Sequence, residues 1–447
     1  MAQFIRLAVN LQAGKNLDTP DVVYNRYVLG KKETTEKNIT MGVPQPLPNN
    51  PNLQNILNLK LEESCFSDWR NNQSVAQQND LAKSLKRSPG FWSCKNGDVL
   101  AILVYDGKAK KVQIAGDFNS WKTDSEDYDF DDYSNDGMVK SFSMQFKPTA
   151  RIEYKLIVDG KWISDPLNPN KVDNGVGGEN SFFTMPDYKP TNLDGGEVPK
   201  LEIIEIDSKV FGEKRKIQVY VPRSESSAIA DGSNLKVQNS NESAAISKFQ
   251  PSATADGSDS STLYLQDGSD YVNRAKAVQI QQNLVKAGKI KPFIMVFLDP
   301  KDRMKEYWAN DDYAKYVATE VVPIIDKQYK TIKSRDARAI MGASLGGITS
   351  VNAALKYPEI FGRVGGQSSS FWVDNERIVK DLEKLNIQTK FKFYFDDGTL
   401  EGVEDSRKVV KILQNKGFDV NYNETEAGHN WTAWRDRLAD AFITIWK

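Results

Sequence analysis

Residues 338–347 read Arg-Ala-Ile-Met-Gly-Ala-Ser-Leu-Gly-Gly and contain the pattern G-x-S-x-G around Ser344. The pentapeptide alone is a weak signal, and the alternative is a glycine-rich turn with a bystander serine. The apolar run before Gly342 predicts a buried strand, and residues 348–357 (ITSVNAALKY) predict a helix. A strand, a tight turn and a helix are what a nucleophile elbow requires. We therefore predict that Ser344 is a nucleophile and that the N–H of Leu345 faces a developing oxyanion.

The chain contains one histidine, His429, in the sequence Glu-Ala-Gly-His-Asn-Trp. A serine hydroxyl needs a base to act as a nucleophile near neutral pH. A lone histidine is more often a surface or packing residue. Here it follows a strand-like run, precedes a C-terminal helical stretch and comes after Ser344 in the chain, as the base does in folds with this elbow. We predict that His429 is the general base.

The acid that orients such a histidine is expected between Ser344 and His429, after the penultimate strand. The run FKFYF at 391–395 predicts that strand. A carboxylate there can fix the histidine tautomer, but any one of several could equally be a solvated loop charge. The residues alone leave five carboxylates open: Asp396, Asp397, Glu401, Glu404 and Asp405.

A second oxyanion donor is expected from the loop after an earlier strand. Residues 263–271 read LYLQDGSDY, in which Gly268 allows close approach of the backbone. We predict that the N–H of Ser269 or Asp270 is the second donor.

The composition excludes several classes of protein. Lys and Arg number 59 against 60 Asp and Glu, which argues against a nucleic-acid-binding protein. No apolar run approaches the length of a membrane span. With one histidine and two cysteines, Cys65 and Cys94, we expect no catalytic zinc site, and the chemistry below requires no cofactor.

The cysteines are compatible with two compartments. They are either free thiols of a cytoplasmic protein or one disulfide of a periplasmic or otherwise exported protein. The N-terminus lacks the sustained apolar segment of a signal peptide, although a processed form would also lack one.

The pattern of residues divides the chain into three parts. Residues 1–95, rich in Asn and Gln, are expected to form a poorly defined N-terminal extension. Residues 96–190 contain short β-branched and aromatic runs between Asp-Gly turn signals, which predict an all-β sandwich. Residues 191–447 alternate strand-like and helical runs, as expected for an α/β fold with a mostly parallel sheet. Within this part, the Ser- and Asn-rich residues 223–261 predict a flexible insertion.

Residues from about 199 to 447 resemble the putative esterase family of α/β-hydrolases, which includes enterochelin (enterobactin) esterases and related carbohydrate esterases. The matching stretches, in order, are LYLQDGSDY, Arg303 with Glu306-Tyr307, IMGASLGG, GGQSSSFW, FDDGTLEG and GHNWTAWRDRL. The resemblance implies a triad, and the family pattern G-T-x-(Asp/Glu) places its acid on Glu401. The chain has Asp267-Gly268 where the feruloyl and acetyl-xylan esterases usually carry His-Gly, which is nearer the enterochelin-esterase branch.

A second resemblance lies in the predicted sandwich. IAGDFNSW, YKLIVDGKW, DPLNPN and GGENSFF resemble the immunoglobulin-like (E-set) glycogen-binding module. The sugar-contacting positions of that module fall on Trp121, Lys155, Trp162 and Asn180. Indole faces can stack on sugars, but the same aromatics could instead be structural, with the module shaping the active site.

Three hypotheses about function follow. The first is a serine carboxylic ester hydrolase acting through an acyl-enzyme on a small-molecule ester such as a catecholate siderophore trilactone. The second is a carbohydrate esterase of the feruloyl or acetyl-xylan type, and the third is a non-catalytic glycan-binding protein. An anionic siderophore predicts Lys and Arg in the pocket, so Arg303 and Arg435 are candidate anion contacts, with a structural ion-pair role as the alternative for each. Trp372 and Trp431 are the other candidate substrate contacts.

Overall fold

The computed structural model describes residues 89–447 apart from 95, 133–137, 176, 194–195, 197, 223–258, 387 and 389. The predictions for the N-terminal extension, for Cys65 and for most of the insertion therefore lie outside the described residues. Contacts divide the chain into two compact units, Met1–Tyr188 and Lys189–Lys447. Cys94 is disulfide-bonded, which agrees with the disulfide alternative for this residue.

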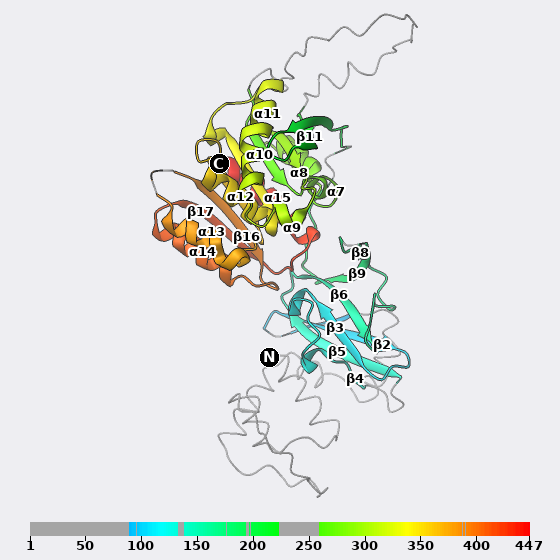
Figure 1. The fold of residues 1–447 in the computed structure, drawn as a ribbon. Helices are drawn as coiled ribbons and strands as arrows, with labels where there is room; N and C mark the ends of the chain where they lie inside the picture. The colour runs from blue at the N-terminus through cyan, green and yellow to red at the C-terminus, as the bar shows by residue number, and fades with distance from the viewer. Residues whose placement is uncertain are drawn as a thin grey trace, which may run out of the picture. The chain divides into compact units, whose positions relative to one another are not determined.

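The described part of the first unit consists of two antiparallel sheets (Figure 1). One has the strand order β1-β2-β5-β4 and the other the order β3-β6-β9-β8, with β7 paired to β6. Buried aromatic side chains join the two sheets: the rings of Phe146 and Phe183 lie 5.9 Å apart. The strands are β1 (Gly90–Ser93), β2 (Val99–Asp106), β3 (Val112–Gly116), β4 (Asp131–Asp132), β5 (Val139–Phe146), β6 (Arg151–Val158), β7 (Lys161–Ile163), β8 (Lys171–Asp173) and β9 (Glu179–Thr184).

The second unit is built on an eight-stranded sheet of order β10-β11-β13-β12-β14-β15-β16-β17. Strand β11 pairs antiparallel with β10 and β13, and the other pairs are parallel. The predicted α/β class is confirmed for this unit. The strands are β10 (Glu202–Ser208), β11 (Glu213–Tyr220), β12 (Thr262–Gln266), β13 (Ile294–Leu298), β14 (Arg338–Ala343), β15 (Arg363–Gln367), β16 (Lys392–Gly398) and β17 (Asp419–Thr425).

Helices cover both faces of this sheet (Figure 1). Buried side chains of α10 to α14 pack on one face, and those of α7, α8 and α15 pack on the other. None of the helices within the described ranges has the length and apolar character needed to cross a bilayer. The helices are α7 (Gly268–Asn273), α8 (Ala277–Lys286), α9 (Arg303–Glu306), α10 (Asp311–Tyr316), the π-helical η5 (Val317–Val321), α11 (Val322–Gln328), α12 (Leu345–Lys356), α13 (Val373–Lys384), α14 (Glu404–Asn415) and α15 (Trp431–Trp446).

The topology gathers the predicted site residues at one edge of the sheet. Parallel strands end at the same edge, so the loops that follow them meet there. Ser344 follows β14 directly, and His429 lies between β17 and α15. Glu401 follows β16, and the Asp267–Ser269 turn follows β12. Segments far apart in sequence are thereby brought within reach of one another.

Candidate active site

Ser344 occupies a strained turn between β14 and α12. Its backbone has φ 57° and ψ −121°, a conformation that is rare for a residue with a side chain and is found mainly at functional sites. A Cβ on Gly342 would lie 2.5 Å from the carbonyl carbon of Gly346, and one on Gly346 would lie 3.1 Å from Cβ of Gln266. Close backbone approach therefore requires glycine at position 342, whereas a Cβ on Gly346 would crowd the side chain of Gln266.

His429 connects Ser344 to a carboxylate. Its Nε2 lies 2.9 Å from Oγ of Ser344, and its Nδ1 lies 2.5 Å from Oε2 of Glu401. With the proton on Nδ1 donated to Glu401, Nε2 can accept the hydroxyl hydrogen of Ser344. The imidazole meets the indole of Trp434 edge to face, with ring centroids 5.0 Å apart, and this contact restricts its rotation.

Glu401 is held by hydrogen bonds on both carboxylate oxygens. Its second oxygen, Oε1, accepts from the hydroxyl of Ser368 at 2.6 Å and from the N–H of Gly398 at 2.8 Å. Burial acts to raise the pKa of Glu401, but the hydrogen bond and charge of His429, the charge of Arg437 and the Ser368 hydroxyl outweigh it. The pKa of Glu401 therefore lies below its usual value, and the carboxylate is ionised at neutral pH.

Ser368 organises the surroundings of Glu401. Its hydroxyl accepts from the indole N–H of Trp434 at 2.9 Å and from Nη2 of Arg437 at 3.0 Å while donating to Glu401. Arg437 in turn donates to Asp396 at 2.6 Å in a fully buried ion pair. The Gly-Gly-Gln-Ser-Ser-Ser run belongs to the stretches that carry the family resemblance, but Ser368 was not predicted to have a role. Its left-handed backbone, with φ 46°, follows from the sharp exit of β15 and leaves no mark in the sequence.

The other carboxylates of the candidate set have different surroundings. Asp396 pairs with Arg437, as described. Burial, followed by the negative charge of Glu401, raises the pKa of Asp397 to about 8, so Asp397 is mostly protonated at neutral pH. Glu404 and Asp405 begin α14. Among these five residues, all within the described part of the chain, Glu401 is the one whose carboxylate accepts the hydrogen bond from His429.

One predicted oxyanion donor is in a favourable position. Leu345 is the first residue of α12, so its N–H has no acceptor within the helix. It also has no hydrogen-bond acceptor elsewhere among the described residues. This N–H follows Ser344 directly and is available to a carbonyl oxygen bound there.

The two other predicted donors are already engaged within the protein. The N–H of Ser269 donates to Asp299 at 2.9 Å, and the N–H of Asp270 donates to the carbonyl of Asp267 at 3.0 Å. In the same turn, the N–H of Gly268 has no acceptor among the residues that the structure describes, although Gly268 is buried. A buried N–H without an acceptor is rare in folded proteins. Gly268 is therefore the residue of this turn whose N–H is available, whereas the sequence had pointed to Ser269 or Asp270 as the donor.

The two arginines predicted to contact substrate each lie beside a carboxylate. Arg303 donates from Nε and Nη2 to the carboxylate of Asp267, at 2.9 and 2.8 Å. Arg435 lies 3.3 Å from the carboxylate of Asp436. Both contacts partly neutralise the positive charge that an anionic substrate would use.

The predicted aromatic contacts differ in exposure. Trp372 is 60% exposed and lies edge to face against Trp308, with ring centroids 6.0 Å apart. Trp308 is 37% exposed and was not predicted. Trp372 lies two residues after Ser370, whose hydroxyl is 3.2 Å from that of Ser344. Trp431 instead contacts Trp434 edge to face at 4.8 Å, beside the ring that holds His429.

In the first unit, the residues matched to glycan-contacting positions lie on or next to the second sheet. Lys155 is on β6, and Trp162, on β7, is 47% exposed. Asn180, on β9, is buried and donates to Glu153 at 3.0 Å. Trp121 follows β3 with a left-handed φ of 60°. Glycan binding at these positions stays a prediction.

Known proteins resemble this chain in sequence and in fold. The family model described as Putative esterase matches residues 239–445. An endo-1,4-beta-xylanase/feruloyl esterase of Xylanibacter ruminicola is 30% identical over 196 residues, which are 41% of this chain and 26% of that protein. The iron(III) enterobactin esterase of Escherichia coli is 23% identical over 195 residues, which are 41% of this chain and 49% of that protein.

The fold has a counterpart among solved structures. The ferric enterobactin esterase of Salmonella typhimurium has a TM-score of 0.62 at 16% identity, over 80% of this chain and 96% of that one. At this level of identity the likeness establishes the fold alone.

Proposed function

We propose that this chain, a carboxylic ester hydrolase whose residues 239–445 belong to the putative esterase family, works through an acyl-enzyme formed on Ser344. The observation that carries the proposal is the continuous hydrogen-bonded series from Ser344 through His429 to Glu401, at 2.9 and 2.5 Å. A hydroxyl, an imidazole and a carboxylate in this order form the arrangement that activates a serine nucleophile.

The proposed reaction has two halves. Oγ of Ser344 attacks the ester carbonyl carbon while Nε2 of His429 takes the hydroxyl proton. The carbonyl–alkoxide bond then breaks, and His429 returns the proton to the leaving alcohol. In the second half, water attacks the acyl-enzyme with His429 again as base, which releases the acid and restores Ser344. Glu401 stabilises the imidazolium formed in each half.

We propose that the oxyanion is held by the N–H of Leu345 and by one N–H of the turn after β12. The Leu345 N–H has no acceptor within its helix. Of the turn residues, Gly268 is the one whose N–H is unengaged among the described residues. Removal of one such donor typically costs about 3 kcal/mol of transition-state stabilisation.

We propose an ester that carries an aromatic group as the substrate class, with an enterobactin-like trilactone as the leading candidate. The similarity to enterobactin esterases supports this candidate, as does the exposed pair Trp308 and Trp372 next to the Ser370 turn. Aromatic rings of a substrate can stack on exposed indoles. A feruloyl ester has the same aromatic character, and the feruloyl esterase relative makes it the second candidate.

The reaction is tested with p-nitrophenyl acetate and with the variants Ser344→Ala and His429→Ala. We expect turnover by the wild type and loss of nearly all turnover in both variants. An inactive wild type, together with no labelling of Ser344 by a fluorophosphonate probe, would favour a non-catalytic protein. The substrate class is tested with ferric enterobactin, a feruloylated xylo-oligosaccharide and acetylated xylan, and fastest hydrolysis of acetylated xylan would contradict it.

For the first unit we propose an immunoglobulin-like E-set sandwich. The two antiparallel sheets and the Phe146–Phe183 contact between them support this assignment. Glycan binding by this unit is a second proposal, supported by the exposed Trp162. Retention of the full-length protein on amylose or xylan, lost in Trp162→Ala, tests it, and equal elution of both proteins would contradict it.

A further inference from the structure

The turn after β12 has an unusual backbone conformation. Asp267 has φ 53°, in the left-handed region, and its carboxylate is buried. A Cβ on Gly346, in the first turn of α12, would lie 3.3 Å from Oδ2 of Asp267, so the turn is packed against the helix that begins after Ser344. Small shifts of Asp267 would therefore move the turn relative to the nucleophile.

One short segment, residues 299–307, restrains this turn at three points. Asp299 accepts from the N–H of Ser269 at 2.9 Å and from its hydroxyl at 2.5 Å. Tyr307 accepts at its hydroxyl from the N–H of Asp267 at 2.8 Å. Arg303 donates two hydrogen bonds to the Asp267 carboxylate. The restraints act on both the backbone and the side chain of the turn.

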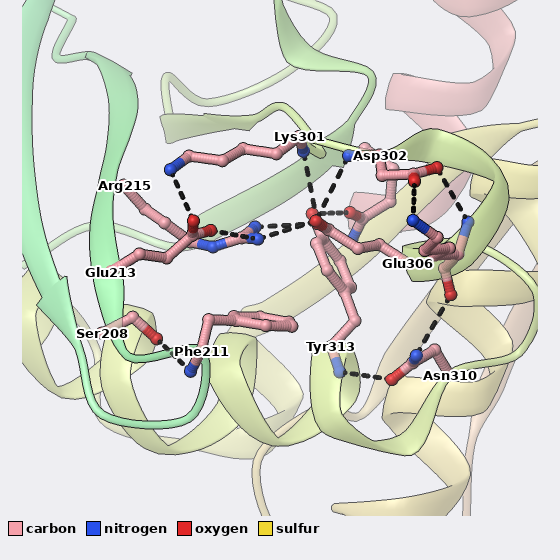
Figure 2. Close-up of polar contacts among 11 residues, drawn as sticks. Ser208, Phe211, Glu213, Arg215, Lys301, Asp302, Glu306, Asn310 and Tyr313 are labelled. Carbon is pink, nitrogen blue, oxygen red and sulfur yellow. Dashed lines mark hydrogen bonds and ion pairs between the residues drawn. The ribbon is translucent and has the colours of Figure 1, made fainter.

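The segment is itself anchored to the sheet by a buried ion pair (Figure 2). Both terminal nitrogens of Arg215, on β11, donate to the carboxylate of Glu306, at 2.8 and 2.7 Å. Glu306 also accepts from the N–H groups of Lys301 and Asp302, at 3.4 and 3.3 Å. Figure 2 shows Lys301 reaching back to Glu213, which lies 2.9 Å from Arg215. A two-pronged arginine–carboxylate pair fixes orientation as well as distance.

We infer that Arg303 is a positioning residue: with Glu306 and Arg215 behind it, it holds the Asp267–Ser269 turn in place to receive the substrate carbonyl oxygen. The inference rests on the proposed function. Burial acts to raise the pKa of Asp267, and the Arg303 guanidinium is the cation that opposes this effect. Without Arg303, Asp267 is a buried carboxylate lacking its counter-charge, which must take up a proton or move towards water. Either change loosens the turn.

The test separates positioning from direct binding of an anionic substrate. We compare Arg303→Lys, Arg303→Gln and wild type on neutral p-nitrophenyl acetate and on anionic p-nitrophenyl hydrogen succinate. Positioning predicts that kcat falls by about tenfold or more on both esters in both variants. Complete loss of an oxyanion donor lowers kcat by roughly 10²- to 10³-fold, and a displaced donor should cost part of that. Lysine keeps the charge but not the two-pronged geometry, so it should not restore kcat. A rise in KM for the succinate alone, with kcat unchanged, overturns the inference.

Lys305→Gln is the matched control. Lys305 lies on the same short helix, but its side chain is 83% exposed and pairs with Asp302 rather than with the turn. This variant should keep wild-type kcat, and a loss equal to that of Arg303→Gln would overturn the inference. Melting temperatures of all variants show whether assays were run on folded protein.

A double-mutant cycle checks that Arg303 acts through Asp267. Asp267→Asn combined with Arg303→Gln should be no slower than the slower single variant, since both changes break one contact. Independent, multiplying losses would overturn the inference. If wild type hydrolyses neither ester, the proposed function fails; if wild type is active and Arg303→Gln keeps its kcat, only this inference fails.

Discussion

The hydroxyl of Ser368 donates to Oε1 of Glu401 at 2.6 Å, on the side of the carboxylate opposite to His429. Replacing Ser368 with alanine should raise the pKa of Glu401, because a hydrogen bond to its ionised form is lost. We expect kcat to fall about tenfold, since a hydrogen bond to a charged group contributes about 1.5–3 kcal/mol. We also expect activity to be lost at a higher pH as the solution is acidified. A pH–rate profile measures both effects.

Ser369→Ala is the control for that prediction. Its hydroxyl is buried and has no hydrogen-bond partner among the described residues. Ser369→Ala should therefore keep the wild-type profile. Identical profiles for the two alanine variants would mean that Ser368 does not act on Glu401.

Glu401→Gln should lower kcat far more than Asp397→Asn does. The glutamine keeps the size of the side chain but removes the charge that stabilises the imidazolium, and a change of this kind lowers kcat by roughly 10³- to 10⁴-fold. Asp397 is mostly protonated at neutral pH because its pKa is about 8, so the asparagine changes little there. Turnover of p-nitrophenyl acetate at pH 7 compares them. Comparable losses in both variants would contradict the assignment of the acid.

Asp397 should make the protein less stable as the pH rises. Its pKa is raised to about 8 in the folded protein, while an aspartate in an unfolded chain has a pKa near 3.9, so between these values the folded state binds the extra proton. This group therefore lowers the free energy of unfolding by up to about 1.4 kcal/mol per pH unit across that window. Asp397→Asn removes the effect.

Urea unfolding of wild type and Asp397→Asn at pH 5 and pH 8 measures this difference. The stability advantage of the variant should be larger at pH 8 than at pH 5. An advantage of the same size at both values would show that the carboxyl titrates at its ordinary pKa. Using the difference between two proteins cancels the titration of other groups.

A phosphonate attached to Ser344 should place its phosphoryl oxygen within hydrogen-bonding distance of the N–H groups of Leu345 and Gly268. Both groups lack acceptors among the described residues, and a bound oxygen satisfies them. A crystal structure of the adduct provides the measurement. An oxygen held instead by Ser269, with Asp299 displaced, would contradict the expectation and restore Ser269 as the donor.

Much of the esterase-like unit could be predicted because its signals are local. The apolar run before Gly342 became β14 and the run FKFYF overlaps β16, since β-branched and aromatic residues favour a buried sheet. The elbow was predictable for a similar reason: a Cβ on Gly342 would lie 2.5 Å from the backbone of Gly346, within the same G-x-S-x-G pattern. The loops that follow parallel strands lie at the same edge of the sheet. The positions of Ser344 and His429 after two such strands therefore also indicated that the two side chains lie close together.

The surroundings of these residues were not predictable from local pattern. Trp434 and Arg437, on α15, donate to the hydroxyl of Ser368, which follows β15 and in turn donates to Glu401, and no spacing in the sequence indicates these contacts. The residues alone left five carboxylates open, and the family resemblance pointed to Glu401. In the structure, Nδ1 of His429 lies 2.5 Å from Oε2 of Glu401, and the role of Glu401 as the acid stays a proposal.

The α/β class, the tight turn at Ser344 and the single imidazole that follows it could therefore be read from the amino-acid sequence, because they depend on local pattern and on composition. The packing of distant segments settles which N–H groups of the Asp267–Asp270 turn are free and places Arg303 against Asp267. Those outcomes depend on competition among donors and acceptors from distant segments. Such competition is settled when the segments pack together and exclude water.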